Sequence, residues 1–451
     1  MIPERRAGAD ALRRLRLARG WSWADQARCL KALASRHGFP RIAAAQTDSI
    51  KRTIARWENG SFAAPGYQYQ VLLAIAYART PAGTAALGPG SDLAEYAAAL
   101  AALGVDASQI AEVVAAATAA ITATGTALTT FLPGPLRAQV GAALSGSCPV
   151  DDELLSGLAA ASAAVAANVG TVPFPRLHLA HAAIADACRQ LAASGAPDPV
   201  AKQLCGVTAA ALAFSARLSF ETSDDEAALA QYAEAAEYAA RTAEPWRKAA
   251  VLAAAAMVGY YISGDPAAGR RTADAAVSEA RRGTSNLVRA RAHAVQAEMA
   301  ARTGQRRHAA TALHRAWHDL DSATAGDPAP ASFSHSHMHG FDGICGIFLG
   351  APEAAERQLT QSAAALTGAR LSIQRAIVLG DRAIAGFHVG GDCAPEKTAH
   401  RLHECVDLIS ATRARVPALR LRVARHALSP WRQTTFVADL DDHIHSALLG
   451  R

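Results

Sequence analysis

The sequence predicts an all-α protein, on three observations. Hydrophobic residues make up 51% of the 451 residues but aromatic residues only 6%, so alanine dominates the apolar content and favours closely packed helices. From residue 92 to residue 220 no strand-like alternation of apolar and polar residues persists. Beyond residue 220, short turns recur at a nearly constant spacing between helical stretches. A chain of this length holds about two or three domains with substantial cores.

The first predicted helix covers residues 11–19, which are rich in arginine and carry leucines at positions 12, 15 and 17 as an apolar side. Gly20 interrupts this pattern. Residues 22–25 then form a capping box, in which Ser22 caps a second helix and Asp25 takes the acidic position.

A further short helix is predicted for residues 49–60. Ile54 and Trp57 lie three residues apart and can face a core, whereas the remaining arc carries basic and polar side chains. Gly60 ends the helix as a C′ glycine does. A basic helix of this size suits the major groove of DNA.

Residues 12–22 and 54–60 together resemble the helix-turn-helix of the Cro/C1 repressor (XRE) family, over residues 9–80. The resemblance implies double-stranded DNA as a partner. In that family the residues that open the recognition helix contact base edges, and the matching positions here are Lys51, Arg52 and, one turn later, Arg56. By the same resemblance Ser49, Thr53 and Asn59 are phosphate or flanking contacts.

The sequence departs from that family in two places. Trp23 stands where the family usually has a phosphate-binding glutamine, and residues 31–48 lengthen the normally tight turn. We expect this insertion to form a loop that adds contacts or shifts the recognition helix. An isolated trio of basic residues would otherwise be a solvated helix face, and it is the surrounding pattern that favours DNA binding.

The charge of the chain is unevenly distributed. Residues 1–80 contain 14 Lys and Arg and 5 Asp and Glu, a net charge of +9. Subtraction from the totals of 45 and 39 leaves 31 and 34, a net charge of −3, for residues 81–451. All the excess basic charge therefore lies in the segment that resembles a DNA-binding domain, where it can neutralise phosphates.

Cysteine usage and the N-terminus favour a cytoplasmic protein. The seven cysteines include no Cys-x-x-Cys pair, so we expect reduced thiols, buried as small apolar side chains. Arginines near the N-terminus replace the apolar region of a signal peptide. Residues 113–136 contain no charged side chain, but Ala and Thr dominate them, so we expect a buried helix and no membrane contact.

The chain beyond residue 80 divides into a linker and two helical regions. Residues 81–91 contain Gly and Pro and are predicted to be a linker, with residues 80–83 as a hinge. Residues 92–220 are predicted to be Ala-rich helices, broken at Gly104, at 133–135, at Gly146, at 170–175 and at 195–197.

Residues 221–451 are predicted to be a repeat array. Turns at 223–224, 264–266, 304–305, 350–352 and 390–392 are separated by 40, 40, 46 and 40 residues, and each joins two helical stretches. The pattern resembles a tetratricopeptide-like solenoid of antiparallel helix pairs, although its period is longer than usual for that family. The predicted helices include 246–263, 267–282, 287–303 and 306–320.

Such an array leaves a concave surface that binds peptides, protein segments or small molecules. Candidate ligand contacts are the residues that interrupt an alanine lining with size or charge. For any one of them the alternative is a core aromatic or a solvated cation. The candidates are Trp246, Arg247, Tyr260, Tyr261, Arg289, Arg291, His293, Gln296, His314 and Trp317.

Neither a metal site nor a catalytic site is predicted. Residues 334–339 contain His335, His337 and His339, but no cysteine or acid lies at an established metal-ligand spacing, and we expect a polar loop. His400, His403 and Glu404 share one helical face and are expected to lie on a surface. The chain also lacks the common nucleotide-binding and hydrolase motifs. We therefore expect no enzyme activity and no cofactor.

These patterns predict a transcription regulator with an N-terminal DNA-binding domain and a C-terminal array that binds an effector or dimerises. The two resemblances, with the Ala- and Arg-rich composition, imply a bacterial protein from a high-GC genome. The effector would be a peptide, a small molecule or a protein, and the regulator would act as a homodimer. The alternative is an interaction adaptor, antitoxin-like or anti-regulatory, whose array is its main binding surface.

Overall fold

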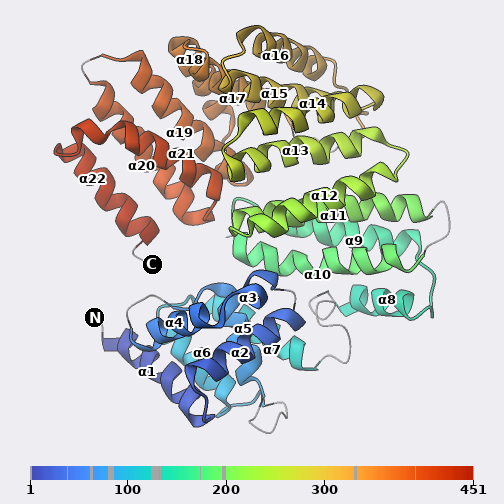
Figure 1. The fold of residues 1–451 in the computed structure, drawn as a ribbon, viewed down its shortest axis with the longest axis vertical. Coiled ribbons are helices and arrows are strands. Elements are labelled where there is room, and N and C mark those ends of the chain that lie inside the picture. Colours follow the sequence, from blue (N-terminus) through green and yellow to red (C-terminus); the bar gives the residue numbers. More distant parts are fainter. Residues whose placement is uncertain are drawn as a thin grey trace. The chain divides into compact units, whose positions relative to one another are not determined.

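The computed structural model is all-helical, which confirms the predicted fold class (Figure 1). It describes residues 3–37, 39–60, 64–79, 86–122, 132, 134–172, 174–195, 200–329, 333–391 and 393–449. An isolated bridge pairs Val169 with Val172. The predicted hinge at residues 80–83 lies outside the described residues.

The chain forms two compact units. The first contains residues 1–145 and 182–187, and the second contains residues 146–181 and 188–451. The expected boundary near residue 80 is therefore not where the compact units divide.

The first unit consists of short helices. Ser22 and Asp25 form the predicted capping box at the start of the second helix, and Gly20 and Gly60 adopt the positive φ that ends a helix. The helices are α1 (Pro3–Ala18), α2 (Trp23–Arg36), α3 (Pro40–Ala44), α4 (Thr47–Glu58), α5 (Tyr67–Tyr77), α6 (Asp92–Ala102), α7 (Ala107–Thr122) and α8 (Gly134–Leu144).

The expected loop at residues 31–48 is helical over most of its length, so that prediction was wrong. Helix α2 continues to Arg36, and Pro40 starts the short helix α3 at its first position. Helix α2 contacts α3, α4 and α5. The insertion is therefore packed onto the helices that carry it.

Helices α6 and α7 belong to the same unit as α1–α5. Helix α6 contacts α1 and α5, and α7 contacts α5 and α6. The rings of Tyr77 and Tyr96 are buried with their centroids 5.4 Å apart, and Arg19 forms an ion pair with Asp92 at 2.6 Å. Tyr96 thus completes a core that residues 1–80 begin.

The charge-free stretch at residues 113–136 is helical in part. Helix α7 covers its beginning, and Val113 and Ala117 are buried there. Residues 123–131 and 133 lie outside the described residues. The one described helix that is long and apolar enough to cross a bilayer is α11, and 67% of its apolar window is buried within the protein.

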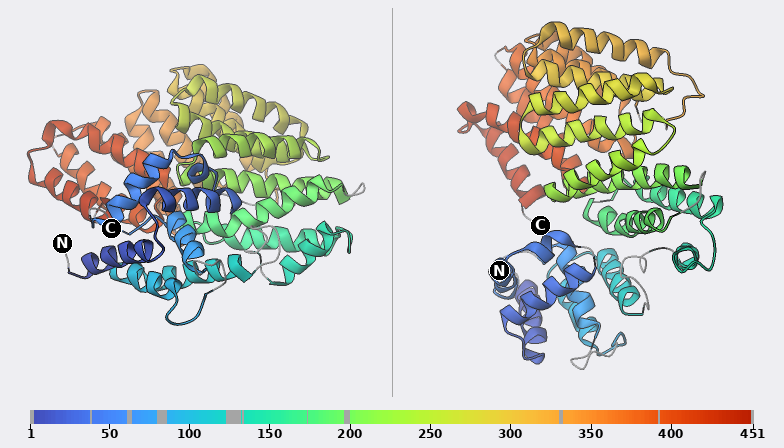
Figure 2. Two further views of the ribbon diagram at one scale, coloured as in Figure 1. Left: turned by 60° about the horizontal axis from the view of Figure 1, so that its bottom comes forward. Right: turned by 45° about the vertical axis from the view of Figure 1, so that its right-hand side comes forward.

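The second unit is a succession of paired helices. Figures 1 and 2 show them following one another from the green to the red part of the chain. They are α9 (Asp152–Ala166), α10 (Phe174–Ala193), α11 (Val200–Glu221), α12 (Asp225–Ala240), α13 (Pro245–Ser263), α14 (Pro266–Arg282), α15 (Asn286–Arg302), α16 (Arg306–Asp321), α17 (His335–Phe348), α18 (Pro352–Ala365), α19 (Ser372–Val389), α20 (Ala394–Thr412), α21 (Arg415–Ala427) and α22 (Thr435–Ile444).

The predicted turns join the two helices of each pair. Every one contains a residue at positive φ: Ser223 at 64°, Gly264 at 70°, Gly304 at 72°, Gly350 at 70° and Gly390 at 86°. Glycine enters this left-handed region without a steric penalty, which explains its recurrence. The four helices predicted between residues 246 and 320 agree with α13–α16 to within one residue at each end.

Alternate helices form an inner row that closes on itself. We call α11, α13, α15, α17, α19 and α21 the inner helices. Each contacts the next in this order, and α21 contacts α11 again. At the closure the backbone N–H of Arg415 donates to Glu221 at 2.6 Å. The inner row is therefore a closed ring.

Small side chains allow this close packing. One core cluster between α13, α14 and α15 is built on Ala249, Ala253, Ala276 and Ala292. At Gly343 a Cβ atom would lie 2.4 Å from Leu359, so α17 approaches α18 more closely than any larger residue permits. The alanine content that predicted helices thus also determines how near they lie.

Candidate nucleic-acid interface and interior cavity

Helix α4 has one buried and one exposed face. Ile50 and Ile54 are each 1% exposed and Trp57 is 7% exposed, as predicted for the last two. Trp57 packs edge-on against Tyr69 with ring centroids 5.1 Å apart. This apolar face determines which residues of α4 face outward.

The exposed face is a single stripe. Ser49, Arg52, Arg56 and Asn59 are exposed, and their spacing of three, four and three residues places them along one side of the helix. The Arg52 Nε donates to the carbonyl of Asp48 at 3.3 Å. Within the described residues the two terminal nitrogens of Arg52 make no hydrogen bond.

Two of the predicted DNA contacts lie beside this stripe. Lys51 is half-buried, and its Nζ donates to Asp48 at 2.9 Å. Thr53 is also half-buried and donates its hydroxyl to the carbonyl of Ser49 at 3.0 Å. The exposed stripe therefore contains Ser49, Arg52, Arg56 and Asn59. Lys51 and Thr53 lie at its edges.

A buried ion pair holds α4 against α1. Arg16 donates from Nε and Nη2 to the two carboxylate oxygens of Glu58, both at 2.7 Å, and both residues are buried. Hydrogen bonding to Glu58 raises the pKa of Arg16. The indole of Trp23 donates to the same carboxylate at 2.8 Å. Trp23 is thus engaged with Glu58, at the position where the family has a phosphate-binding residue.

Glu58 was not among the residues predicted to contribute to the site. It could have been recognised in the sequence as an acidic residue on the apolar side of a basic helix, one residue after Trp57.

No known protein family, curated protein or solved structure matches this chain. The remaining description of the site therefore depends on the geometry alone.

An interior cavity lies within the ring of inner helices. It consists of two adjoining chambers of about 290 and 380 Å³, which share lining residues from all six inner helices. The shared residues include Arg217, Met257, Arg291, His337, Ile377 and Val416. Volumes of this order suit a small organic ligand.

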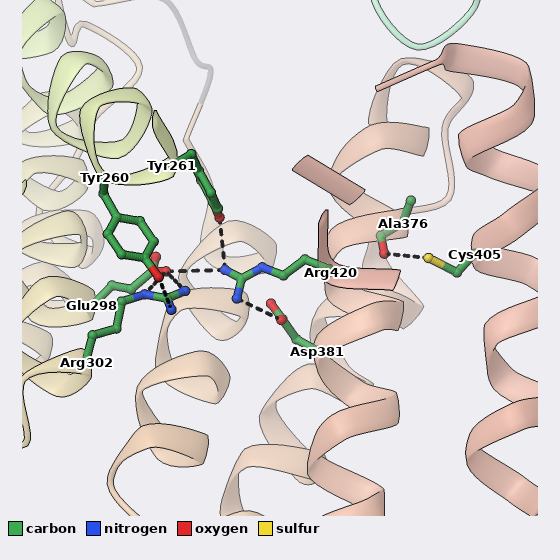
Figure 3. Close-up of polar contacts among 8 residues, drawn as sticks. All are labelled: Tyr260, Tyr261, Glu298, Arg302, Ala376, Asp381, Cys405 and Arg420. Carbon is green, nitrogen blue, oxygen red and sulfur yellow. Dashed lines mark hydrogen bonds and ion pairs between the residues drawn. The ribbon is translucent and has the colours of Figure 1, made fainter. Parts of the chain in front are cut away.

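A polar cluster contributes to the lining of the smaller chamber, and Figure 3 shows its contacts. Arg420 of α21 donates to the hydroxyl of Tyr261 at 2.9 Å and lies 3.4 Å from carboxylate oxygens of Glu298 and of Asp381. Arg302 donates to Glu298 at 2.6 Å and to the hydroxyl of Tyr260 at 2.8 Å. The cluster thus joins α13, α15, α19 and α21.

Burial controls ionisation in this cluster. Burial raises the pKa of Asp381 to about 6, partly offset by the positive charge of Arg420. Burial also raises the pKa of Tyr261 to about 12, so its hydroxyl stays neutral and accepts from Arg420. The neighbouring carboxylates keep Arg420 charged.

The predicted ligand contacts do not converge on one site. Tyr261 and Arg291 line the cavity, whereas Trp246 belongs to a core cluster and Tyr260 belongs to the polar cluster. The others are held by local partners outside the cavity lining. These are Arg247 with Glu244, Arg289 with Asp319, His293 with Gln296, Gln296 with Asp274 and Trp317 with Asp342. His314 also lies outside the lining.

The histidine-rich segment is helical, so the expected loop was wrong. Residues 335–339 form the first turns of α17. His337 faces the cavity, while His335 bonds Asp321 and His339 bonds Gln358. His403 stacks on His443 in the C-terminal helices. Within the part of the chain that the structure describes, no group of three metal-ligating residues is close enough to hold a metal ion.

The cysteines form no disulfide. Cys188, Cys205, Cys345 and Cys405 are buried, as predicted, whereas Cys148 and Cys393 are exposed and Cys29 is intermediate.

Proposed function

We propose that this chain is a cytoplasmic DNA-binding transcription regulator of the Cro/C1 helix-turn-helix type. Its recognition helix is α4. The exposed stripe of Ser49, Arg52, Arg56 and Asn59, opposite a buried apolar face, carries the proposal. Arginine guanidiniums bind guanine O6 and N7 in pairs of hydrogen bonds, and asparagine suits adenine or a phosphate. The net charge of +9 in residues 1–80 supplies the general attraction to DNA.

The second unit supplies regulation in this proposal. Its helix pairs support the resemblance to tetratricopeptide-like arrays, and its interior cavity offers a place for an effector. An effector changes DNA affinity only if it binds two arrangements of the protein differently. One recognition helix reads few base pairs, so the regulator binds two half-sites as a homodimer.

The test is a binding experiment on the full chain. Genomic footprinting identifies the operator, and fluorescence anisotropy then measures its affinity as a function of salt. Replacement of Arg52 by Ala should cost about 1–3 kcal/mol on the operator, and less on random DNA. Arg13→Ala removes the same charge from an exposed site on α1 and is the matched control.

Two outcomes would contradict the proposal. Equal weakening by Arg52→Ala on operator and on random DNA would remove Arg52 from the base-reading residues. Absence of salt-dependent DNA binding altogether would favour the adaptor alternative, in which the second unit is the working surface.

A further inference from the structure

The acids in the cavity lining already have partners. Glu298 accepts from Arg302 and lies beside Arg420, and Asp381 pairs with Arg420. The remaining acid of the lining, Glu221, accepts the backbone N–H of Arg415 at 2.6 Å. Burial raises the pKa of Glu221, and the positive charges of Arg217 and Arg415 oppose this shift.

Two arginines of the lining have no such partner. Within the described residues, neither Arg217 of α11 nor Arg291 of α15 has an acid within ion-pair distance or makes a hydrogen bond. Arg217 lies over the ring of Phe174, with 5.8 Å between the guanidinium carbon and the ring centroid. Burial lowers the pKa of Arg291, and the nearby charge of Arg217 lowers it further. Both arginines are partly buried, and two cations near each other repel unless an anion joins them.

The walls beside these arginines are apolar. Met257 of α13 and Ile377 of α19 line both chambers, and Phe341 of α17 and Phe214 of α11 line one chamber each. Pockets for small ligands combine such walls with a few polar groups that fix orientation. Both arginines line both chambers, so they mark the region where the chambers adjoin as the place for a charged head group.

We propose that the cavity binds a small organic carboxylate, with its head group between Arg217 and Arg291 and its hydrocarbon or aromatic body against Met257, Phe341 and Ile377. Arginine suits this role because its planar guanidinium donates to both oxygens of a carboxylate. This inference names the effector class and, for the ligand's regulatory role, rests on the proposed function.

The test uses three probes that share a phenylbutyl body and carry a negative, a neutral or a positive head group. The full chain is titrated with 4-phenylbutyrate, 4-phenylbutanol and 4-phenylbutylamine by isothermal calorimetry, and its thermal midpoint is measured in parallel. The acid should bind at least about tenfold more tightly than the alcohol, and the amine more weakly still. Only the acid should raise the thermal midpoint clearly.

Variants then locate the head group. Arg217→Met and Arg291→Met should each weaken 4-phenylbutyrate by about tenfold or more and leave 4-phenylbutanol nearly unchanged. Arg307→Met, which removes an exposed cation of α16 outside the cavity lining, is the matched control. Arg291→Met should also keep or raise the thermal midpoint of the unliganded protein, because it removes a partly buried cation and its repulsion with Arg217.

Three results would overturn the inference. They are equal binding of the acid and the alcohol, equal loss in Arg307→Met and Arg291→Met, and a lowered thermal midpoint of unliganded Arg291→Met. Failure of the proposed function gives a different result, since a chain without operator binding would still discriminate the three probes. An operator-binding chain that ignores 4-phenylbutyrate would refute the carboxylate site alone.

Discussion

At the residue scale, the position of α4 depends on one buried ion pair. Arg16 and Glu58 are 6% and 5% exposed, and their two hydrogen bonds form the paired arrangement that arginine makes with a carboxylate. Since Trp23 donates to the same carboxylate, Glu58 connects α1, α2 and α4. The orientation of the exposed stripe therefore depends on a residue that faces away from it.

Replacement of Glu58 by Gln should destabilise the protein by about 3–5 kcal/mol, because it leaves the buried Arg16 guanidinium without its counter-charge. Urea unfolding followed by the fluorescence of the tryptophans measures this loss. The Arg14–Glu95 pair is exposed at both ends, so Arg14→Met should cost at most about 1 kcal/mol and serves as the control. Similar values for the two variants would contradict the structural role of Glu58.

Two buried histidines should make the second unit sensitive to acid. His181 bridges the hydroxyls of Ser162 and Ser215 at 2.8 and 3.0 Å, and burial lowers its pKa to about 3. Burial likewise lowers the pKa of His178 to about 4. Both values lie below the ordinary histidine pKa of about 6.5, so the unfolded chain binds more protons between these limits.

Stability should therefore be complete above about pH 6.5 and fall as the pH drops toward 4, by at most about 1.4 kcal/mol per pH unit for each histidine. His181→Gln keeps a hydrogen-bonding side chain that does not titrate, so the decline should be shallower. Urea unfolding at several pH values measures it. His308→Gln, at an exposed imidazole, is the control, and an unchanged decline in His181→Gln would refute this account.

At the element scale, α6 and α7 complete the first unit. Helix α6 buries Leu93, Tyr96 and Leu100 within this unit, and Ser91 caps its start. Without it, Tyr77 loses the Tyr96 ring and keeps only the ring of Trp21. Residues 1–80 carry the recognition pattern but do not contain the whole core.

A fragment of residues 1–122 should therefore fold cooperatively and keep salt-sensitive DNA binding, whereas a fragment of residues 1–85 should not fold cooperatively. Loss of three large buried side chains at about 1.5–3 kcal/mol each exceeds much of the stability of a small domain. Circular dichroism during heating compares the two fragments. Equally sharp unfolding transitions would show that α6 and α7 are dispensable.

At the scale of the whole second unit, the inner helices form a closed ring. Arg420 contacts residues 159 and 122 positions earlier in the chain, at Tyr261 and Glu298. The side chain of Arg420 thus reaches from α21 to residues of α13 and α15, and the inner helices surround a cavity that is partly open to solvent. Its volume suits a small ligand better than a long peptide.

Replacement of Arg420 by Met should cost about 3–5 kcal/mol, because Asp381 loses its partner and Glu298 loses one of two. Addition of Asp381→Leu should recover part of this loss, since an apolar pair of similar volume replaces a buried ionic one. Chemical unfolding measures both variants, and hydrogen exchange in α13 and α15 should increase in the single variant. Arg425→Met, which removes an ion pair with Asp441 at the surface of the same helix, is the control.

The sequence by itself determined most of the helices and the turns between the paired ones, although residues 31–48 and 335–339 were expected to be loops and are largely helical. Alanine content, capping residues such as Ser22 and glycines at left-handed positions act locally, so Gly264 and Gly304 could be located without knowledge of the fold. The outward face of α4 also followed from its periodicity, because Ile54 and Trp57 had to be buried. The charge of the N-terminal segment was visible directly.

Only the tertiary structure decided which distant residues meet. The pairing of Arg16 with Glu58 spans 42 positions and that of Arg420 with Tyr261 spans 159, and no local pattern encodes such contacts. The same reason explains why Trp246 and Trp317 were predicted at a ligand site and lie elsewhere, while Arg217 was not predicted and lines the cavity. Which side chains face the interior depends on how the ring closes. The closure depends in turn on the packing angles of all the helix pairs together.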